Sequence, residues 1–169
     1  MLKEAGLDRI NHNLNSSRAY YHNICSTHTF EQRVANIKML QGLGFEICSG
    51  GIIGMGESKE DVVDMLLELR EIRPEALPIN FLLPIPGTPL EHADMSALTT
   101  AYCMKVLCLA RLLVPQSDIR CAAGREIYFK GEEKNLLRVV DSIFASGYLT
   151  AGGQGIKDTI QIGRASCRE

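Results

Sequence analysis

The sequence of 169 residues contains no block of basic residues and no acidic tail, and its 18 Lys and Arg residues nearly balance 20 Asp and Glu residues. This balance argues against a nucleic-acid-binding arm and against a charged, solvated tail. Its apolar runs fall far short of the roughly 20 residues that a transmembrane helix needs. We therefore expect a cytoplasmic protein whose partners include neither a nucleic acid nor a membrane.

Cysteine pairs at zinc-ligand spacing are also missing. The six cysteines are spread along the chain without a CxxC pair, which argues against a closed structural zinc site. The opening MLKEAGLDRI carries charges and no apolar segment, so it does not resemble an export signal. Without export, the thiols are expected to be reduced.

What the sequence does contain is an alternation of strand and helix patterns. Short β-compatible stretches run into Gly, Pro, Asn or Ser, and residues with apolar side chains at helical spacing lie between them. This rhythm predicts an α/β fold with parallel strands and with polar residues at the carboxyl ends of the strands. Strands are expected near residues 8–13, 46–53, 78–83 and 118–122, and helices near 29–43, 58–72 and 97–113.

The two ends of the sequence follow this rhythm less well. The opening MLKEAG looks like the end of a helix with a Gly stop, as if the chain entered in the middle of a fold. Residues 131–150 suggest a helix and then a short extended piece, and residues 151–159 suggest a glycine-rich loop. The final GRASCRE has no apolar face, so residues 163–169 are expected to be disordered.

Three asparagines, Asn11, Asn13 and Asn15, alternate at the first predicted strand. At strand spacing they project to one face, where each amide can donate and accept hydrogen bonds to a polar ligand. An Asn-rich turn before a helix explains the same pattern equally well. The pattern alone leaves both interpretations open.

The segment CSGGIIGMGE, residues 48–57, combines a cysteine, four glycines and an acid. A cysteine in an apolar strand, such as Cys48, is usually a small core residue. Gly50 and Gly51 permit the close approach of a ligand or of another backbone. Arg120, on the fourth predicted strand, is the other unusual residue, because a buried guanidinium needs a partner, most simply a carboxylate.

Six blocks of sequence occur in the order and spacing typical of one enzyme family. They are NHNLNSS, THTFEQR, CSGGIIGMGE, PINFL…GTPLE, IRCAAGRE and SIFASGYLTAGGQ. Together they make the sequence resemble the biotin synthases, a family of radical S-adenosylmethionine enzymes. The resemblance implies an α/β fold that is a partial TIM barrel, in which residues 1–162 form roughly strands five to eight and residues 163–169 are a tail foreign to the family.

The resemblance also implies a reaction, its cofactors and a substrate. Biotin synthases use S-adenosylmethionine and a 4Fe–4S cluster to make a 5′-deoxyadenosyl radical, and a 2Fe–2S cluster donates sulfur to dethiobiotin. The whole protein is implied to be a homodimer. By position, the 2Fe–2S ligands are Cys48 and Arg120, the residues for S-adenosylmethionine are Asn13, Asn15, Arg33 and Ile52, and those for dethiobiotin are Asn11, Asn13 and Asn80.

The sequence departs from the family at the cluster ligands. The CxxxCxxC motif for the 4Fe–4S cluster and two further cysteines for the 2Fe–2S cluster are absent, so the chain alone is expected to be inactive. Cys25, Cys103, Cys108 and Cys121 are interpreted as packing residues, and Cys167 is assigned to no site. Two alternatives stay open: another radical barrel enzyme, of the hydrogenase-maturation or pyrrolysine-pathway type, or a non-catalytic half-barrel.

Overall fold

The computed structural model describes residues 1–144, 157, 159, 160 and 162. In this part of the chain every pair of neighbouring strands is parallel, which confirms the predicted α/β fold. The strands are β1 (Arg9–Asn11), β2 (Glu46–Cys48), β3 (Gly51–Ile53), β4 (Ala76–Phe81), β5 (Asp118–Cys121) and β6 (Ser142–Ile143). The helices are α1 (Tyr21–Ile24), α2 (Phe30–Gly42), α3 (Lys59–Ile72), α4 (Thr100–Leu113), α5 (Arg125–Tyr128) and α6 (Glu133–Leu136).

The sheet follows the order β1-β2-β4-β5-β6, and β3 also pairs with β4. β2 and β3 are two halves of one strand position, because both pair with β4 and only Ser49 and Gly50 separate them. The strand predicted over residues 46–53 is therefore interrupted. Past β1 the pairing resumes, since Asn15 forms an isolated parallel bridge with Gly51.

For residues 131–150 a helix followed by a short extended piece was expected, and the described residues show both, as α6 over Glu133–Leu136 and β6 over Ser142–Ile143. The extended piece is a strand because it pairs with the free edge of β5, where Arg120 is in register with Ser142. Asp141, just before β6, accepts a hydrogen bond from the backbone nitrogen of Ile119 at 2.7 Å and fixes this register.

Helices α2 and α3 begin within one residue of the predicted starts at 29 and 58, whereas α4 begins at Thr100, three residues after the predicted start at 97. Thr29 and Ser58 form capping boxes with Gln32 and Asp61, and these boxes start α2 and α3. α4 ends before Pro115, which cannot continue a helix. Within the described residues, no helix is long and apolar enough to cross a membrane.

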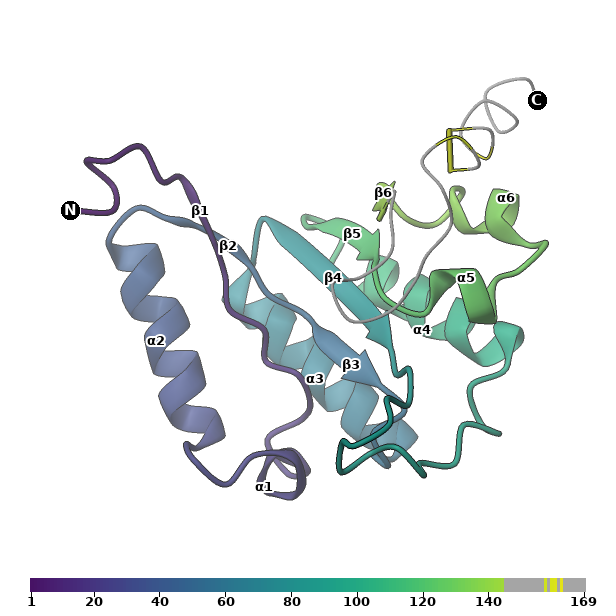
Figure 1. Ribbon diagram of the computed structural model, residues 1–169. Helices are drawn as coiled ribbons and strands as arrows, with labels where there is room; N and C mark the ends of the chain where they lie inside the picture. The colour runs from purple at the N-terminus through teal and green to yellow at the C-terminus, as the bar shows by residue number, and fades with distance from the viewer. Residues whose placement is uncertain (145–156, 158, 161, 163–169) are drawn as a thin grey trace.

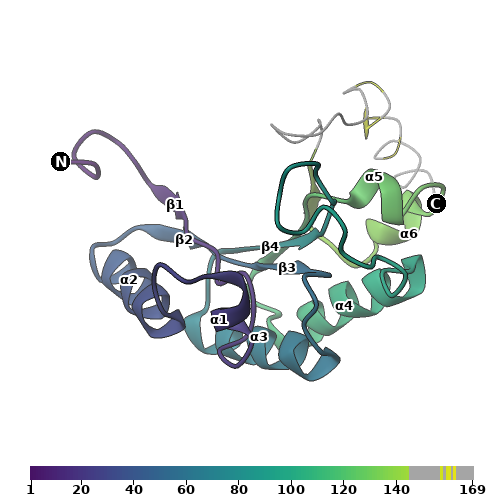
Figure 2. The ribbon, with the colours of Figure 1, turned by 60° about the horizontal axis from the view of Figure 1, so that its bottom comes forward.

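The helices α2, α3 and α4 lie on the same side of the sheet (Figures 1 and 2). On that side, Ile47, Leu77, Ile79 and Ile119 are fully buried in the hydrophobic core. Burial of each such side chain contributes roughly 1.5–3 kcal/mol. The core therefore holds one face of the sheet against the helices and leaves the alternate side chains to point away from them.

The predicted tail, residues 163–169 with Cys167, lies outside the described residues, as does most of the loop predicted over 151–159. Residues 157 and 159, which are described, are helical and not part of a loop.

Candidate functional site

The strand register brings four of the predicted site residues to the sheet face that points away from the helices. Asn11 is in register with Cys48, and Cys48 is in register with Ala76. Asn80 follows four residues after Ala76 on β4, and Arg120 is in register with the residue two before Asn80. Registered partners and residues at even spacing along a strand project to the same face. Asn11, Cys48, Asn80 and Arg120 therefore share one face.

Cys48 ends β2 and is 9% exposed. The side-chain amide of Asn11 donates a hydrogen bond to its sulfur, with 3.3 Å between Nδ2 and Sγ. Asn11 thus orients the thiol across the sheet. A soft sulfur ligand held at a strand end suits an iron–sulfur cluster.

Arg120 lacks the buried carboxylate partner that its position suggests. Its Nη2 is 3.7 Å from Asp118, which is more than half exposed, so this ion pair is loose. Its Nε is buried and has no hydrogen-bond partner in the part of the chain that the structure describes. An unsatisfied buried donor is costly. The guanidinium is therefore suited to bind a ligand that lies against this face of the sheet.

Asn80 is 7% exposed and joins three backbone segments. Its Nδ2 donates to the carbonyl oxygen of Gly51 at 3.2 Å, and its Oδ1 accepts from the backbone nitrogen of Ala123 at 3.2 Å. An amide can make further bonds from the same two groups. Asn80 therefore ties β3 and β4 to the loop after β5, whether or not it also contacts a ligand.

Asn13 and Asn15 differ in what their side chains contact. Asn13 accepts a hydrogen bond from the backbone nitrogen of Gly50 at 3.1 Å, which joins it to the neighbouring strand position and not to a turn of its own segment. Asn15 has a φ of 71°, in the left-handed region that asparagine tolerates better than most residues. Its backbone bonds to Gly50 and Ile52, and its side chain makes no hydrogen bond within the described residues. The Asn15 amide is therefore free to bind a ligand.

Arg33 lies on α2 and reaches back to the strand segment that carries Asn13. Its Nη1 donates to the Asn13 carbonyl oxygen at 3.0 Å, and its Nε donates to the hydroxyl of Tyr21 at 2.7 Å. Its Nη2 lies 2.6 Å from Nε2 of His28. Three of the five guanidinium N–H groups are thus engaged, which fixes the plane of the group and leaves two donors.

The glycines after Cys48 allow a close approach between two backbones. A Cβ atom on Gly50 would overlap the carbonyl oxygen of Pro78, far inside the 3.0 Å that real Cβ contacts respect. Gly54 and Gly56 both have a φ of +104°, which side-chain-bearing residues rarely adopt. Only glycine therefore permits this path of the chain.

Glu57 has a structural role in the turn that leads into α3. Its two carboxylate oxygens accept hydrogen bonds from the backbone nitrogens of Gly54 at 2.7 Å and Met55 at 2.8 Å. The acid at the end of the glycine-rich segment therefore closes the turn between β3 and α3. Its spacing of three residues from Gly54 is the signal that could have indicated this.

The interpretation of four cysteines as packing residues holds for the two that lie deepest. Cys103 and Cys121 are fully buried, and burial raises the pKa of each thiol to about 12. Cys108, on α4, is half-buried. For Cys25 the interpretation is incomplete, because it borders the core but its sulfur contacts Thr27 and His28.

The fold is that of a partial α/β barrel with parallel strands. Methylornithine synthase (PylB) superposes with a TM-score of 0.73 at 17% identity, over 96% of this chain and 52% of that one. The FeFe-hydrogenase maturase HydG from Carboxydothermus hydrogenoformans superposes with a TM-score of 0.71 at 12% identity, over 98% of this chain and 43% of that one. At these identities the likeness shows the fold alone.

The family follows from the sequence models. Residues 78–165 match the Biotin and Thiamin Synthesis associated domain, and residues 1–69 match the Radical SAM superfamily. The first match covers more than half of the chain, which therefore belongs to the family of the Biotin and Thiamin Synthesis associated domain.

The curated relatives confirm the resemblance to biotin synthases. Biotin synthase from Thermus thermophilus is 47% identical over 153 residues, which are 90% of this chain and 46% of the relative. Biotin synthase from Sulfurihydrogenibium sp. is 46% identical over 153 residues, 90% of this chain and 45% of the relative. Biotin synthase from Leptospira interrogans is 43% identical over 160 residues, which are 95% of this chain and 45% of the relative. The chain spans about half the length of the curated relatives it matches.

Proposed function

We propose that this chain serves in the radical S-adenosylmethionine reaction that inserts sulfur into dethiobiotin to form biotin, the last step of biotin biosynthesis. The relatives named biotin synthase and the match to the Radical SAM superfamily support this function. The structural observation that carries it is the shared sheet face of Cys48 and Arg120, where a buried Arg120 donor lacks an acceptor among the described residues.

Cys48 and Arg120 would hold the 2Fe–2S cluster, which supplies sulfur to the substrate when it is bound. The Cys48 sulfur is the soft ligand, and Asn11 keeps it facing the sheet surface through a hydrogen bond of 3.3 Å. Arg120 lies on the same face, and its buried Nε has no acceptor among the described residues. The 4Fe–4S cluster belongs to the same proposal, but none of the described residues is assigned to it.

Asn13, Asn15, Arg33 and Ile52 would bind S-adenosylmethionine. Arg33 has two donors left for a carboxylate, and its other three bonds orient the guanidinium beside Asn13. The side-chain amide of Asn15 can bind the ribose side. Ile52 is half-buried beside Asn80 and offers an apolar surface for the adenine ring.

Dethiobiotin would lie against Asn11, Asn13 and Asn80. Its ureido ring carries donors and an acceptor, which amide side chains match well. Asn11 and Asn80 face the same side of the sheet as Cys48, so a substrate held there lies close to the proposed sulfur source. A homodimer and a cytoplasmic location complete the proposal.

The substitution Cys48→Ser tests this function in a chimera that joins the chain to the CxxxCxxC-bearing half of a biotin synthase. If Cys48 is a cluster ligand, the variant should lose 2Fe–2S absorption, bound iron and biotin formation, because a hydroxyl is a harder and far less acidic ligand than a thiol. If Cys48 is only a core residue, the variant should lose about 1–3 kcal/mol of stability and keep the cluster and biotin formation. Cys108→Ser, on α4, is the matched control and should keep the cluster. A normal cluster and normal turnover in Cys48→Ser would refute the assignment.

A second candidate is a related barrel enzyme of the hydrogenase-maturation or pyrrolysine-pathway type. PylB and HydG share its fold, but their identities of 17% and 12% are far below the 43–47% of the three biotin synthases. Assaying the same chimera for biotin separates these functions.

A further inference from the structure

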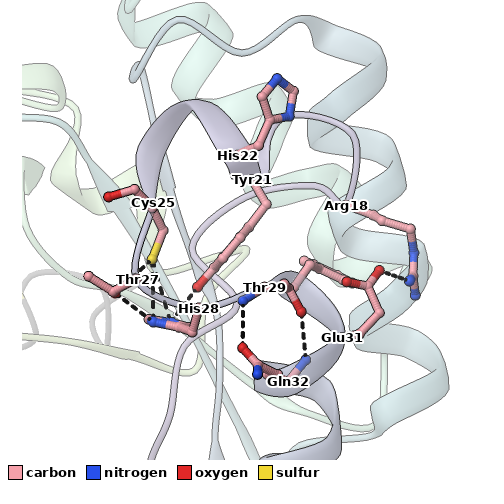
Figure 3. Close-up of a pocket in the computed structure, with 11 residues that line it drawn as sticks. Arg18, Tyr21, His22, Cys25, Thr27, His28, Thr29, Glu31 and Gln32 are labelled. Atoms are coloured by element: carbon pink, nitrogen blue, oxygen red, sulfur yellow. Dashed lines mark hydrogen bonds and ion pairs between the residues drawn. The ribbon is translucent and has the colours of Figure 1, made fainter.

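A cavity of about 540 Å³ lies at the amino-terminal end of α2, and neither Cys48 nor Arg120 lines it. Its wall is formed by α1, by the loop that follows it and by the first turn of α2 (Figure 3). Cys25 stands on this wall with its sulfur directed toward Thr27 and His28 (Figure 3). The proposed function uses neither the cavity nor this thiol.

The sulfur of Cys25 is surrounded by hydrogen-bond donors. The Thr27 hydroxyl lies 3.5 Å from Sγ, and Nδ1 of His28 lies 3.4 Å from it. These contacts favour the thiolate over the thiol, because donors stabilise a negative charge. The Thr27 hydroxyl is the largest influence, helped by the backbone N–H groups of Thr27 and His28, and together they lower the pKa of Cys25 from 9.0 to about 7.

Arg33 decides which imidazole nitrogen of His28 carries the proton. An arginine side chain can only donate, so Nε2 of His28 accepts from Nη2 of Arg33 across 2.6 Å. A neutral His28 must then carry its proton on Nδ1, the nitrogen that faces Cys25 and Thr27. The guanidinium of Arg33 therefore sets the tautomer of His28 in which the Nδ1–H group faces the sulfur of Cys25.

Every charged or titratable group near the thiol can be named from the elements packed around it. They are Tyr21 and His22 of α1, His28 of the loop, Arg33 of α2, and the ion pair of Arg18 with Glu31 on the cavity wall. His22 points away from Cys25 (Figure 3). The only carboxylate in this set is held by Arg18, so no charged group in it opposes ionisation of the sulfur; the influence that does oppose it is desolvation by burial, which the hydrogen bonds outweigh.

We propose that Cys25 is a modification site, an activated thiol that small hydroperoxides oxidise to a sulfenic acid. The thiol first releases its proton to solvent, and the thiolate sulfur attacks one oxygen of hydrogen peroxide. An S–O bond forms as the O–O bond breaks, so the sulfur loses two electrons and the peroxide gains them. The products are Cys25 sulfenic acid and hydroxide, which takes a proton from water. The cavity gives the peroxide access to the sulfur.

The test follows Cys25 in the 169-residue chain by peptide-resolved mass spectrometry. Alkylation by iodoacetamide is measured against pH in buffer and in concentrated urea, and sulfenic acid formed by hydrogen peroxide at pH 7 is trapped with dimedone. We expect a midpoint near pH 7 in buffer that moves toward 9.0 in urea. At pH 7 the native thiol should react about 5-fold faster than in urea, since its larger thiolate fraction outweighs its lower intrinsic nucleophilicity.

Two variants sharpen the result. Thr27→Val removes the hydroxyl from an exposed loop and should raise the alkylation midpoint of Cys25, whereas Cys108→Ser, on α4, should leave it unchanged. A native midpoint equal to that in urea, or no dimedone adduct at Cys25 after peroxide, overturns the proposal. An unchanged midpoint in Thr27→Val also overturns it, because the structure makes that hydroxyl the main source of activation.

Discussion

Replacement of Gly50 by alanine tests the close packing that positions the proposed site. A Cβ atom there would overlap the carbonyl oxygen of Pro78, and the two backbones would have to separate by roughly 1 Å, which as overpacking costs about 1–3 kcal/mol. The movement also endangers the bonds that Gly50 makes with Asn13 and Asn15, at 3.1 and 3.0 Å, each contributing about 1 kcal/mol. We therefore expect Gly50→Ala to lose about 3–5 kcal/mol of unfolding free energy, a large part of an ordinary domain's stability.

Urea denaturation followed by circular dichroism measures this loss, and Gly42→Ala is its matched control. Gly42 ends α2 with nothing within 4 Å of its would-be Cβ, so alanine should change the stability by less than about 1 kcal/mol, in the stabilising direction. A loss below about 1 kcal/mol for Gly50→Ala, at an unchanged denaturant slope, would refute the steric reasoning.

Three further predictions concern single residues and the chain alone. Asn15→Ala should lose about 1 kcal/mol in urea denaturation because of the left-handed backbone, and Asn15→Gly should not; equal losses would contradict this. Hydrogen bonds from Ser17 and then Ser58 lower the pKa of Asp61 in the folded protein. The stability that the ionised carboxylate contributes is therefore present above the pKa of the unfolded chain, near 4, and is lost as pH falls through the folded pKa. Asp61→Asn should make the stability depend less on pH in this acid range. The chain alone, without CxxxCxxC, should form no 5′-deoxyadenosine from S-adenosylmethionine under reducing, iron-replete conditions, and chromatographic detection above a no-protein control would overturn this.

The helices and the strand positions could be predicted because their signals are local. Ser58 and the acid three residues later mark the start of α3, and Pro115 marks the end of α4, whatever the rest of the chain does. The interruption at Gly50 is different. It depends on the Pro78 carbonyl, which only the pairing of β4 brings near. The sequence of that segment indicated a short extended piece, but its pairing as β6 depends on the edge of β5, which residue preferences could not indicate.

In the candidate site too, unusual residue types could be recognised from the sequence, whereas contacts between distant residues could not. Arg120 stands out because a guanidinium is unusual on a buried strand, whereas Cys48 is an ordinary core residue type that only the family resemblance singles out; the register then places both on one face. The Thr27 hydroxyl that does most to lower the pKa of Cys25 lies only two residues along the chain, whereas the orientation of the neighbouring His28 ring depends on Arg33 of α2 and could not be predicted. Spacing in the sequence gives no information about that orientation.

The asparagines of the proposed site hold the sheet together, and this changes how their substitution must be interpreted. Asn80 bonds to Gly51 and Ala123, and Asn13 bonds to Gly50, before any ligand is bound. These contacts fix the amide groups in position, so a ligand meets groups whose side-chain entropy is already lost. Loss of activity on replacing Asn80 or Asn13 would therefore mix lost binding with a displaced strand. Asn15 makes no such side-chain bond within the described residues, so Asn15→Gly, which keeps the left-handed backbone, isolates the binding contribution of its amide.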